Sequence, residues 1–101
     1  MKAYLITPEN KLIEPVEVAS LQDIKTIIGF DTIESDAVGT AGDRLFFDEE
    51  CFLRGATGRF QIDKLIPVSG KGIIVSVDSD GTTFVDVVIT NDELSQSIKY
   101  L

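Results

Sequence analysis

The side chains that most often carry catalysis are scarce in this chain. Its 101 residues include no histidine and a single cysteine, Cys51. A Ser-His-Asp or Cys-His nucleophilic system and the usual general base near neutral pH are therefore excluded. Zinc binding within one chain is not expected, because zinc sites combine several Cys and His ligands. We expect no metal and no cofactor, and an enzyme would have to rely on carboxylates or on the backbone.

The arginines are concentrated in one stretch, at Arg44, Arg54 and Arg59, and the last two flank a glycine loop. Backbone N–H groups exposed by glycines can form an anion nest, which two guanidinium groups could close around a phosphate or a carboxylate. The candidate ligand-binding residues are therefore Arg54, Gly55, Thr57, Gly58 and Arg59. The alternative is that these arginines form ion pairs with neighbouring acidic residues, and the abundance of surface ion pairs favours it.

Cys51 follows an acidic run and precedes Arg54. The guanidinium would lower the pKa of the thiol, whereas the carboxylates of Asp48, Glu49 and Glu50 would raise it. We expect a partly buried structural cysteine, because free cysteines are among the most buried residues. The acidic run itself is expected to be a solvated turn.

Two short motifs imitate ligand loops. The segment 78–81 (Asp-Ser-Asp-Gly) begins like a calcium loop, but Ile89 stands where an EF-hand needs a bidentate Glu. A hairpin turn explains the same residues. The segment 69–72 (Ser-Gly-Lys-Gly) resembles part of a phosphate loop, yet it lacks the glycine spacing and the Lys-Ser/Thr pair. We interpret it as a glycine-hinged start of a strand.

The charge balance is strongly acidic. The chain has 17 Asp and Glu against 9 Lys and Arg, a net charge of −8. Direct binding to nucleic acid or to anionic lipid is not expected, because phosphate contacts need Lys or Arg. We interpret the acidic surface as a source of solubility, with nucleic-acid mimicry as the alternative. Mimicry would require carboxylates at near-phosphate spacing on one face.

No segment predicts a membrane span or a signal peptide. The longest apolar run, 72–77, is far shorter than the roughly 20 residues that cross a bilayer. A single cysteine is typical of a reducing compartment. We therefore expect a cytoplasmic protein without membrane contact.

One α+β domain over residues 1–101 is predicted to position these groups, with two helices packed on one face of a mainly antiparallel sheet. Alternating or β-branched runs predict strands at 2–6, 12–18, 30–38, 44–47, 72–78 and 82–89. Pro15 places the second strand at a sheet edge or at a bulge. The segment 59–65 is either a strand or a short helical turn.

Two helices are predicted from their capping residues. Ser20 with Asp23 starts the first helix, which ends at Gly29. Thr90 with Glu93 forms a capping box for a terminal helix. The face of this helix is predicted from three apolar residues, Leu94, Ile98 and Leu101.

Short motifs over most of the chain occur in a recognisable order. A Ser-Leu helix opens at Ser20 and closes on Gly29, and a strand bearing Ile-Glu follows at 33–34. An acidic turn at 48–50, a Leu-x-Gly step at 53–55 and Arg59 come next, and Gly72 precedes an apolar strand. This order resembles a bacterial and phage-borne family catalogued only as a domain of unknown function.

The chain departs from that family at two positions. Gly58 stands where an Asn commonly precedes the Arg, and Phe30 stands where a second Gly is common. The resemblance implies a phage, prophage or mobile-element setting in the bacterial cytoplasm. It implies no activity.

These observations predict a non-enzymatic accessory protein of phage or mobile-element type that binds a host or phage macromolecule. We expect the partner to be a protein and the chain to be a monomer or a homodimer. The alternative is a small anion- or nucleotide-binding domain that uses the arginine-flanked glycine loop.

Overall fold

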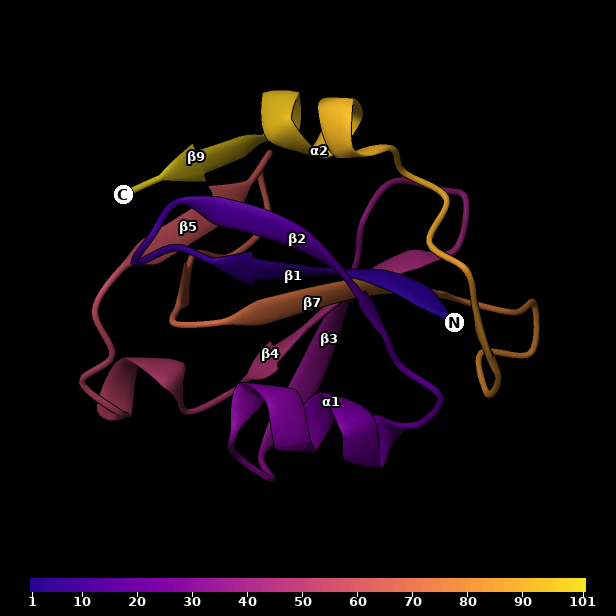
Figure 1. Cartoon of the computed structure of the whole chain (residues 1–101), viewed down its shortest axis with the longest axis horizontal. Coiled ribbons are helices and arrows are strands. Elements are labelled where there is room, and N and C mark those ends of the chain that lie inside the picture. The colour runs from indigo at the N-terminus through magenta and orange to yellow at the C-terminus, as the bar shows by residue number, and fades with distance from the viewer.

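The strands of the molecule form a large and a small sheet. The computed structural model describes all residues, 1–101 (Figure 1). The large sheet contains β1 (Lys2–Thr7), β2 (Leu12–Glu17), β3 (Ile33–Ala37), β4 (Asp43–Asp48), β7 (Gly72–Val77) and β8 (Phe84–Val85). The small sheet contains β5 (Arg59–Ile62), β6 (Val68–Ser69) and β9 (Ile98–Tyr100). The helices are α1 (Leu21–Ile28), α2 (Asn91–Ser97) and the 3-10 helix η1 (Cys51–Leu53).

Every strand pair is antiparallel, which confirms the predicted α+β class with a mainly antiparallel sheet. The large sheet has the order β2-β1-β7-β4-β3, with β8 also paired to β7, and the small sheet has the order β6-β5-β9. Ile74 of β7 lies opposite Tyr4 on one side and Leu45 on the other. β7 is therefore the central strand of the large sheet.

The large sheet is covered on both faces. Ile73 and Val75 of β7 pack on one face with Ile24 and Ile28 of α1. Ile74 packs on the other face, in a cluster whose other members include Phe60 of β5 and Leu94 of α2. Successive side chains of a strand point to opposite faces, so β7 contributes to the apolar clusters on both sides of the large sheet. This explains why its sequence is a continuous apolar run.

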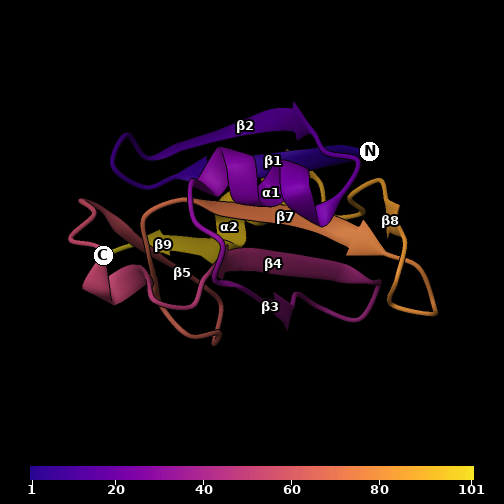
Figure 2. The same cartoon turned by 90° about the horizontal axis from the view of Figure 1, so that it is seen from below.

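The helices accordingly lie on opposite sides of the large sheet, with α1 below it and α2 above it (Figure 1). Figure 2 shows α1 lying across β1 and β7. The expectation that both helices pack on one face is wrong. The physical reason is that β7 presents apolar side chains on both faces of the sheet. Each face is therefore buried by a different set of packed elements.

α1 forms as its capping residues predict. The Ser20 hydroxyl accepts the Asp23 N–H at 3.4 Å, and the Asp23 carboxylate accepts the Ala19 N–H at 2.7 Å. Gly29 ends the helix at φ 92°, a backbone angle that side chains with a Cβ rarely adopt.

α2 starts at its predicted capping box but ends early. Thr90 and Glu93 cap each other, and the helix stops at Ser97. Residues 98–100 instead form β9, with Tyr100 opposite Phe60 and Ile98 opposite Ile62. The prediction of a terminal helix through Leu101 is therefore wrong, because pairing with β5 outweighs the local helical pattern.

The predicted strand over 82–89 is also mostly absent. Only Phe84–Val85 pair with β7. The next residues, 86–90, form an extended segment that we call the strap. The buried Asp43 carboxylate accepts the N–H groups of Val88 and Ile89, both at 2.8 Å, and the Ser76 hydroxyl at 2.5 Å. These bonds take the place of a strand ladder.

The two edges of the large sheet are β2 and β3. Pro15 lies in β2, as predicted for an edge strand. β3 is shorter than the predicted strand over 30–38 and starts only at Ile33.

No helix of the chain is both long enough and apolar enough to cross a bilayer.

Candidate functional site

Arg54 is held by acidic and aromatic neighbours. Its Nε donates to Asp48 Oδ2 at 2.9 Å, and its Nη2 donates to Glu50 Oε2 at 3.2 Å. Its guanidinium carbon lies 4.2 Å from the centroid of the Phe30 ring, a cation–π contact. The ion-pair alternative from the sequence is therefore confirmed for Arg54.

Asp48 anchors this arrangement from inside the protein. Only 3% of it is exposed, so its predicted place on a solvated turn is wrong. Its carboxylate accepts the Thr32 hydroxyl, the Glu50 N–H at 3.1 Å and the Arg54 Nε. Burial alone would raise the pKa of Asp48, but the hydrogen bonds from Thr32 and Arg54 outweigh it and hold the pKa below its ordinary value.

Arg59 has a different environment. Its guanidinium lies 5.3 Å from the Phe52 ring, and no carboxylate lies within ion-pairing distance. The two arginines that flank the glycine loop thus contact different aromatic rings. The small sheet also fixes Arg59, because its carbonyl accepts the Leu101 N–H at 3.0 Å.

Both glycines of the glycine loop adopt left-handed backbone conformations. Gly55 and Gly58 have φ values of 70° and 84°. A Cβ at Gly58 would stand 2.5 Å from the backbone nitrogen of Glu9, so the loop is packed against the β1–β2 turn. The Gly58 carbonyl accepts the Gly70 N–H at 3.1 Å. The N–H groups of residues 55–58 have no acceptor within the protein.

A cavity of about 290 Å³ lies beside this loop. Four segments line it: the β1–β2 turn, the end of α1 with Phe30, residues 48–57 and the β6–β7 turn. Of the predicted site residues, Arg54 and Thr57 line the cavity, whereas Gly55, Gly58 and Arg59 do not. Lys71, which the sequence did not single out as a ligand residue, lines it as well.

Cys51 forms part of the cavity wall as a buried free cysteine, which agrees with the predicted structural role. Its Sγ accepts the Ser69 N–H at 3.5 Å. This bond ties η1 to β6 and leaves the thiol supporting the loop that carries Arg54.

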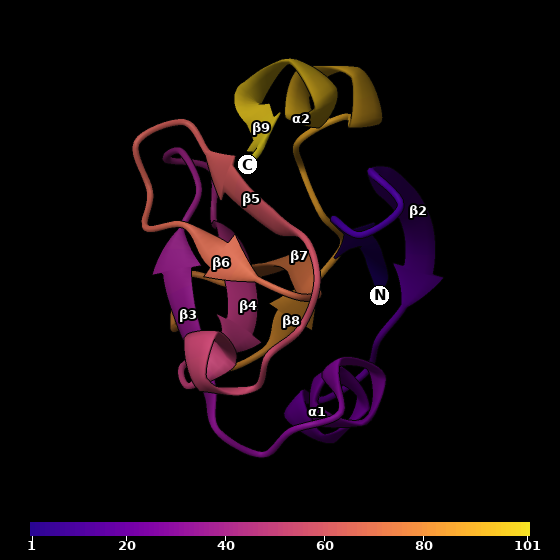
Figure 3. The same ribbon diagram turned by 90° about the vertical axis from the view of Figure 1, so that its left-hand side faces the viewer.

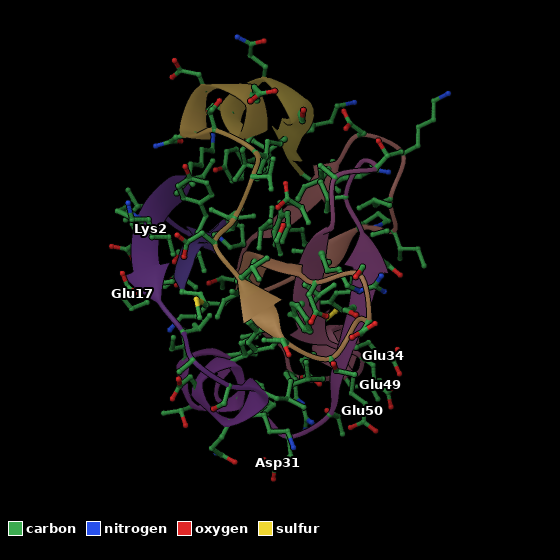
Figure 4. All side chains as sticks on the ribbon, turned by 90° about the vertical axis from the view of Figure 1, so that its right-hand side faces the viewer. Lys2, Glu17, Asp31, Glu34, Glu49 and Glu50 are labelled. Carbon is green, nitrogen blue, oxygen red and sulfur yellow. The ribbon has the colours of Figure 1, made fainter.

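A second cluster of charge lies along the β3 edge. Glu34, Glu49 and Glu50 gather there, and Asp31 lies nearby (Figure 4). The Glu34 carboxyl raises the pKa of Glu49 through a shared hydrogen bond and through charge repulsion. No group of His, Cys, Asp or Glu in the chain has a geometry suited to a metal ion.

A third feature is an exposed surface at the end of the molecule that carries η1 and the small sheet (Figure 3). Arg59 and Lys99 lie on the outer side of this sheet, since Phe60, Tyr100 and their neighbours face the core. Phe52 and Leu53 of η1 are 51% and 82% exposed, and Leu101 is 58% exposed. We call this surface the basic–apolar face, made of Phe52, Leu53, Arg59, Lys99 and Leu101.

Comparison with protein-family models, with curated proteins and with solved structures found no match. The resemblance to a phage-borne family therefore stays a prediction.

Sequence reasoning missed Lys71, Phe30 and Asp43. Lys71 was visible only as part of an imperfect phosphate loop, and Arg54, which lines the same cavity, comes from another segment of the chain. Asp43 carried no signal, because its partners Val88 and Ile89 are more than 40 residues away.

Proposed function

We propose that the protein is a non-enzymatic accessory module that binds a protein partner through the basic–apolar face. The observation that carries the proposal is the 82% exposure of Leu53, the most exposed large apolar side chain of the chain, beside Phe52 and Arg59. Aromatic and arginine side chains dominate the energetics of many protein interfaces.

The charge of the face indicates the chemistry of the partner. Arg59 and Lys99 form no ion pair within a chain whose net charge is −8. Cations of this kind attract an acidic surface and speed its association. The partner we propose is therefore an acidic protein segment with apolar side chains that cover Phe52 and Leu53. The phage or mobile-element setting is supported by the sequence resemblance alone, and the cytoplasmic location is supported by that resemblance and by the single cysteine.

The test compares two double variants in a pull-down from lysate of the native bacterial host. Leu53→Ser with Arg59→Glu alters the face, and Leu21→Ser with Lys25→Glu makes matched changes on α1. Leu21 is 43% exposed, so the control also removes an exposed leucine and a cation. We expect a stoichiometric acidic partner with the wild type and with the control, and at least tenfold less of it with the face variant.

Retention of the same proteins by all three forms would overturn the proposed face. A nucleic acid retained in place of a protein would overturn the proposed class of partner.

A small-ligand function is the second candidate. It is favoured by the cavity beside Arg54. No residue of the basic–apolar face lines this cavity, although Phe52 and Leu53 directly precede Arg54 in the sequence.

A further inference from the structure

The residues that line the cavity beside Arg54 include hydrogen-bond donors that have no protein acceptor. The residues Ala56, Thr57 and Lys71 all line it, and their backbone N–H groups donate to nothing within the protein. Arg54 uses Nε and Nη2 for Asp48, Glu50 and Thr32, which leaves Nη1 without an acceptor. Successive free N–H groups of this kind are what anion-binding loops present.

The free N–H groups follow directly after the end of η1. Arg54 is right-handed, with φ −85° and ψ −14°, and Gly55 is left-handed, with φ 70°. This pair of conformations ends η1, because the Arg54 N–H donates to the Cys51 carbonyl at 3.3 Å, and it leaves the following N–H groups of Gly55 and Ala56 without a protein acceptor. The Gly70 N–H to Gly58 carbonyl bond and the contact of Gly58 with Glu9 hold the loop in place.

Two carboxylates, Glu9 and Asp48, and two cations, Arg54 and Lys71, line the cavity, so the case for an anion depends on which of these groups are already paired. Lys71 forms no ion pair, so its ammonium is available to a ligand. Asp48 also lines the cavity, but its carboxylate already accepts from Thr32, Glu50 and Arg54. The other carboxylate in the lining, Glu9, is exposed at the β1–β2 turn.

The rest of the lining is mixed, with polar Thr7 and Ser69 beside an apolar part. Ile28, Phe30 and Pro8 contribute to it, and 38% of Phe30 is exposed although Arg54 lies against its ring. The cavity volume of about 290 Å³ is just below the range for small-molecule sites, about 300–1,000 Å³. A ligand that fills it needs an apolar body as well as a charged end.

We propose that this cavity binds a small oxyanion with an apolar body, its charged end held by Lys71 and by the free N–H groups of residues 56 and 57. The apolar body packs against Phe30 and Ile28. The site is distinct from the basic–apolar face, because none of the residues of that face lines the cavity, although Phe52 and Leu53 lie in sequence between the lining residues Cys51 and Arg54.

The test is an amide NMR titration of the full chain with phenyl phosphate and with benzoate, which carry the same ring on two different oxyanions. Phenol and inorganic phosphate supply the ring and the anion separately. We expect saturable shifts at the amides of Ala56, Thr57 and Lys71, with a Kd below about 1 mM for at least one of the two ring-bearing anions. The tighter of these two then identifies the oxyanion.

Two variants complete the test. Lys71→Met is expected to weaken binding about tenfold, as loss of a charged hydrogen-bond donor does. Lys99→Met removes the same charge outside the cavity and is expected to leave Kd within twofold. The amide spectrum of each variant, recorded first, shows that it is folded.

Several outcomes would overturn the proposal. Shifts that stay linear up to 20 mM of both ring-bearing anions would do so, as would saturation at amides away from the cavity. Equal weakening of ligand binding by Lys71→Met and Lys99→Met would show that only the net charge of the protein matters. If inorganic phosphate bound as tightly as phenyl phosphate, the ring would contribute nothing to binding and the proposed apolar part of the site would be wrong.

Discussion

Asp48 is the residue through which three segments meet. It links the loop before β3, through Thr32, to the acidic turn, through Glu50, and to the glycine loop, through Arg54. A buried carboxylate with this many donors stabilises the fold most while it is ionised, because protonation turns one oxygen into a donor and removes the charge that strengthens these hydrogen bonds.

The lowered pKa of Asp48 predicts how stability depends on pH. The unfolded chain binds the proton more readily than the folded protein, so the contribution of Asp48 is present above its ordinary pKa of 3.8 and is lost as the pH falls below it. We expect Asp48→Asn to lower the free energy of unfolding by about 2 kcal/mol at pH 7. Urea unfolding at pH 7 and pH 3 measures this.

The same experiment should show a smaller loss between pH 7 and pH 3 for Asp48→Asn than for the wild type. Asp31→Asn serves as the control, since Asp31 is exposed and its carboxylate accepts no hydrogen bond from the protein. An equal loss of stability with pH in the wild type and Asp48→Asn would contradict the role given to Asp48.

Among the elements, those with local signals were predictable and those that depend on distant partners were not. α1 follows from Ser20, Asp23 and Gly29, which lie within ten residues of one another and act on the same turns. The C-terminal segment carries a helical pattern, yet β5 converts its last residues to a strand. The strap deviates from a strand because Asp43, 45 residues away from Val88, accepts its N–H.

The candidate site divides in the same way. The glycine loop could be found from its Arg and Gly residues, since φ above zero is a local requirement. The cavity could not, because the β1–β2 turn, Phe30 and Lys71 reach it only through the sheet. The pairing of Arg54 with acidic residues was foreseen as the alternative, but the burial of Asp48 was not.

At the scale of elements, the strap should depend on the Asp43 carboxylate. We expect Asp43→Asn to speed amide hydrogen exchange of Val88 and Ile89 by roughly tenfold, because an amide oxygen cannot accept both N–H groups as well as a carboxylate does. Asp80→Asn makes the same change on the exposed β7–β8 turn and should leave these rates unchanged. Unaltered exchange at Val88 and Ile89 in Asp43→Asn would show that other contacts hold the strap.

For the whole molecule, both edges of the large sheet resist pairing with another chain. β2 carries Pro15, which cannot donate to a neighbouring strand. β3 presents Glu34 beside Glu49, and two copies meeting there would bring these like charges together. Of the two oligomeric states expected from the sequence, this arrangement favours the monomer.

Sedimentation equilibrium checks this prediction. We expect a monomer mass at concentrations up to about 100 µM at pH 7, where carboxylates are ionised. Glu34→Gln with Glu49→Gln removes the repulsion and is the variant most able to associate. A dimeric wild type would show that a different surface, such as the basic–apolar face, joins two copies.

The position of β7 has a consequence for the order of folding during synthesis. β7 separates β1 from β4, so the N-terminal hairpin and the β3–β4 hairpin have no common partner until residues 72–77 leave the ribosome. The small sheet can be completed only later in synthesis, because its strand β9 ends at residue 100. Such non-local pairing slows folding, and the first seventy residues are exposed to proteases and chaperones until the central strand arrives.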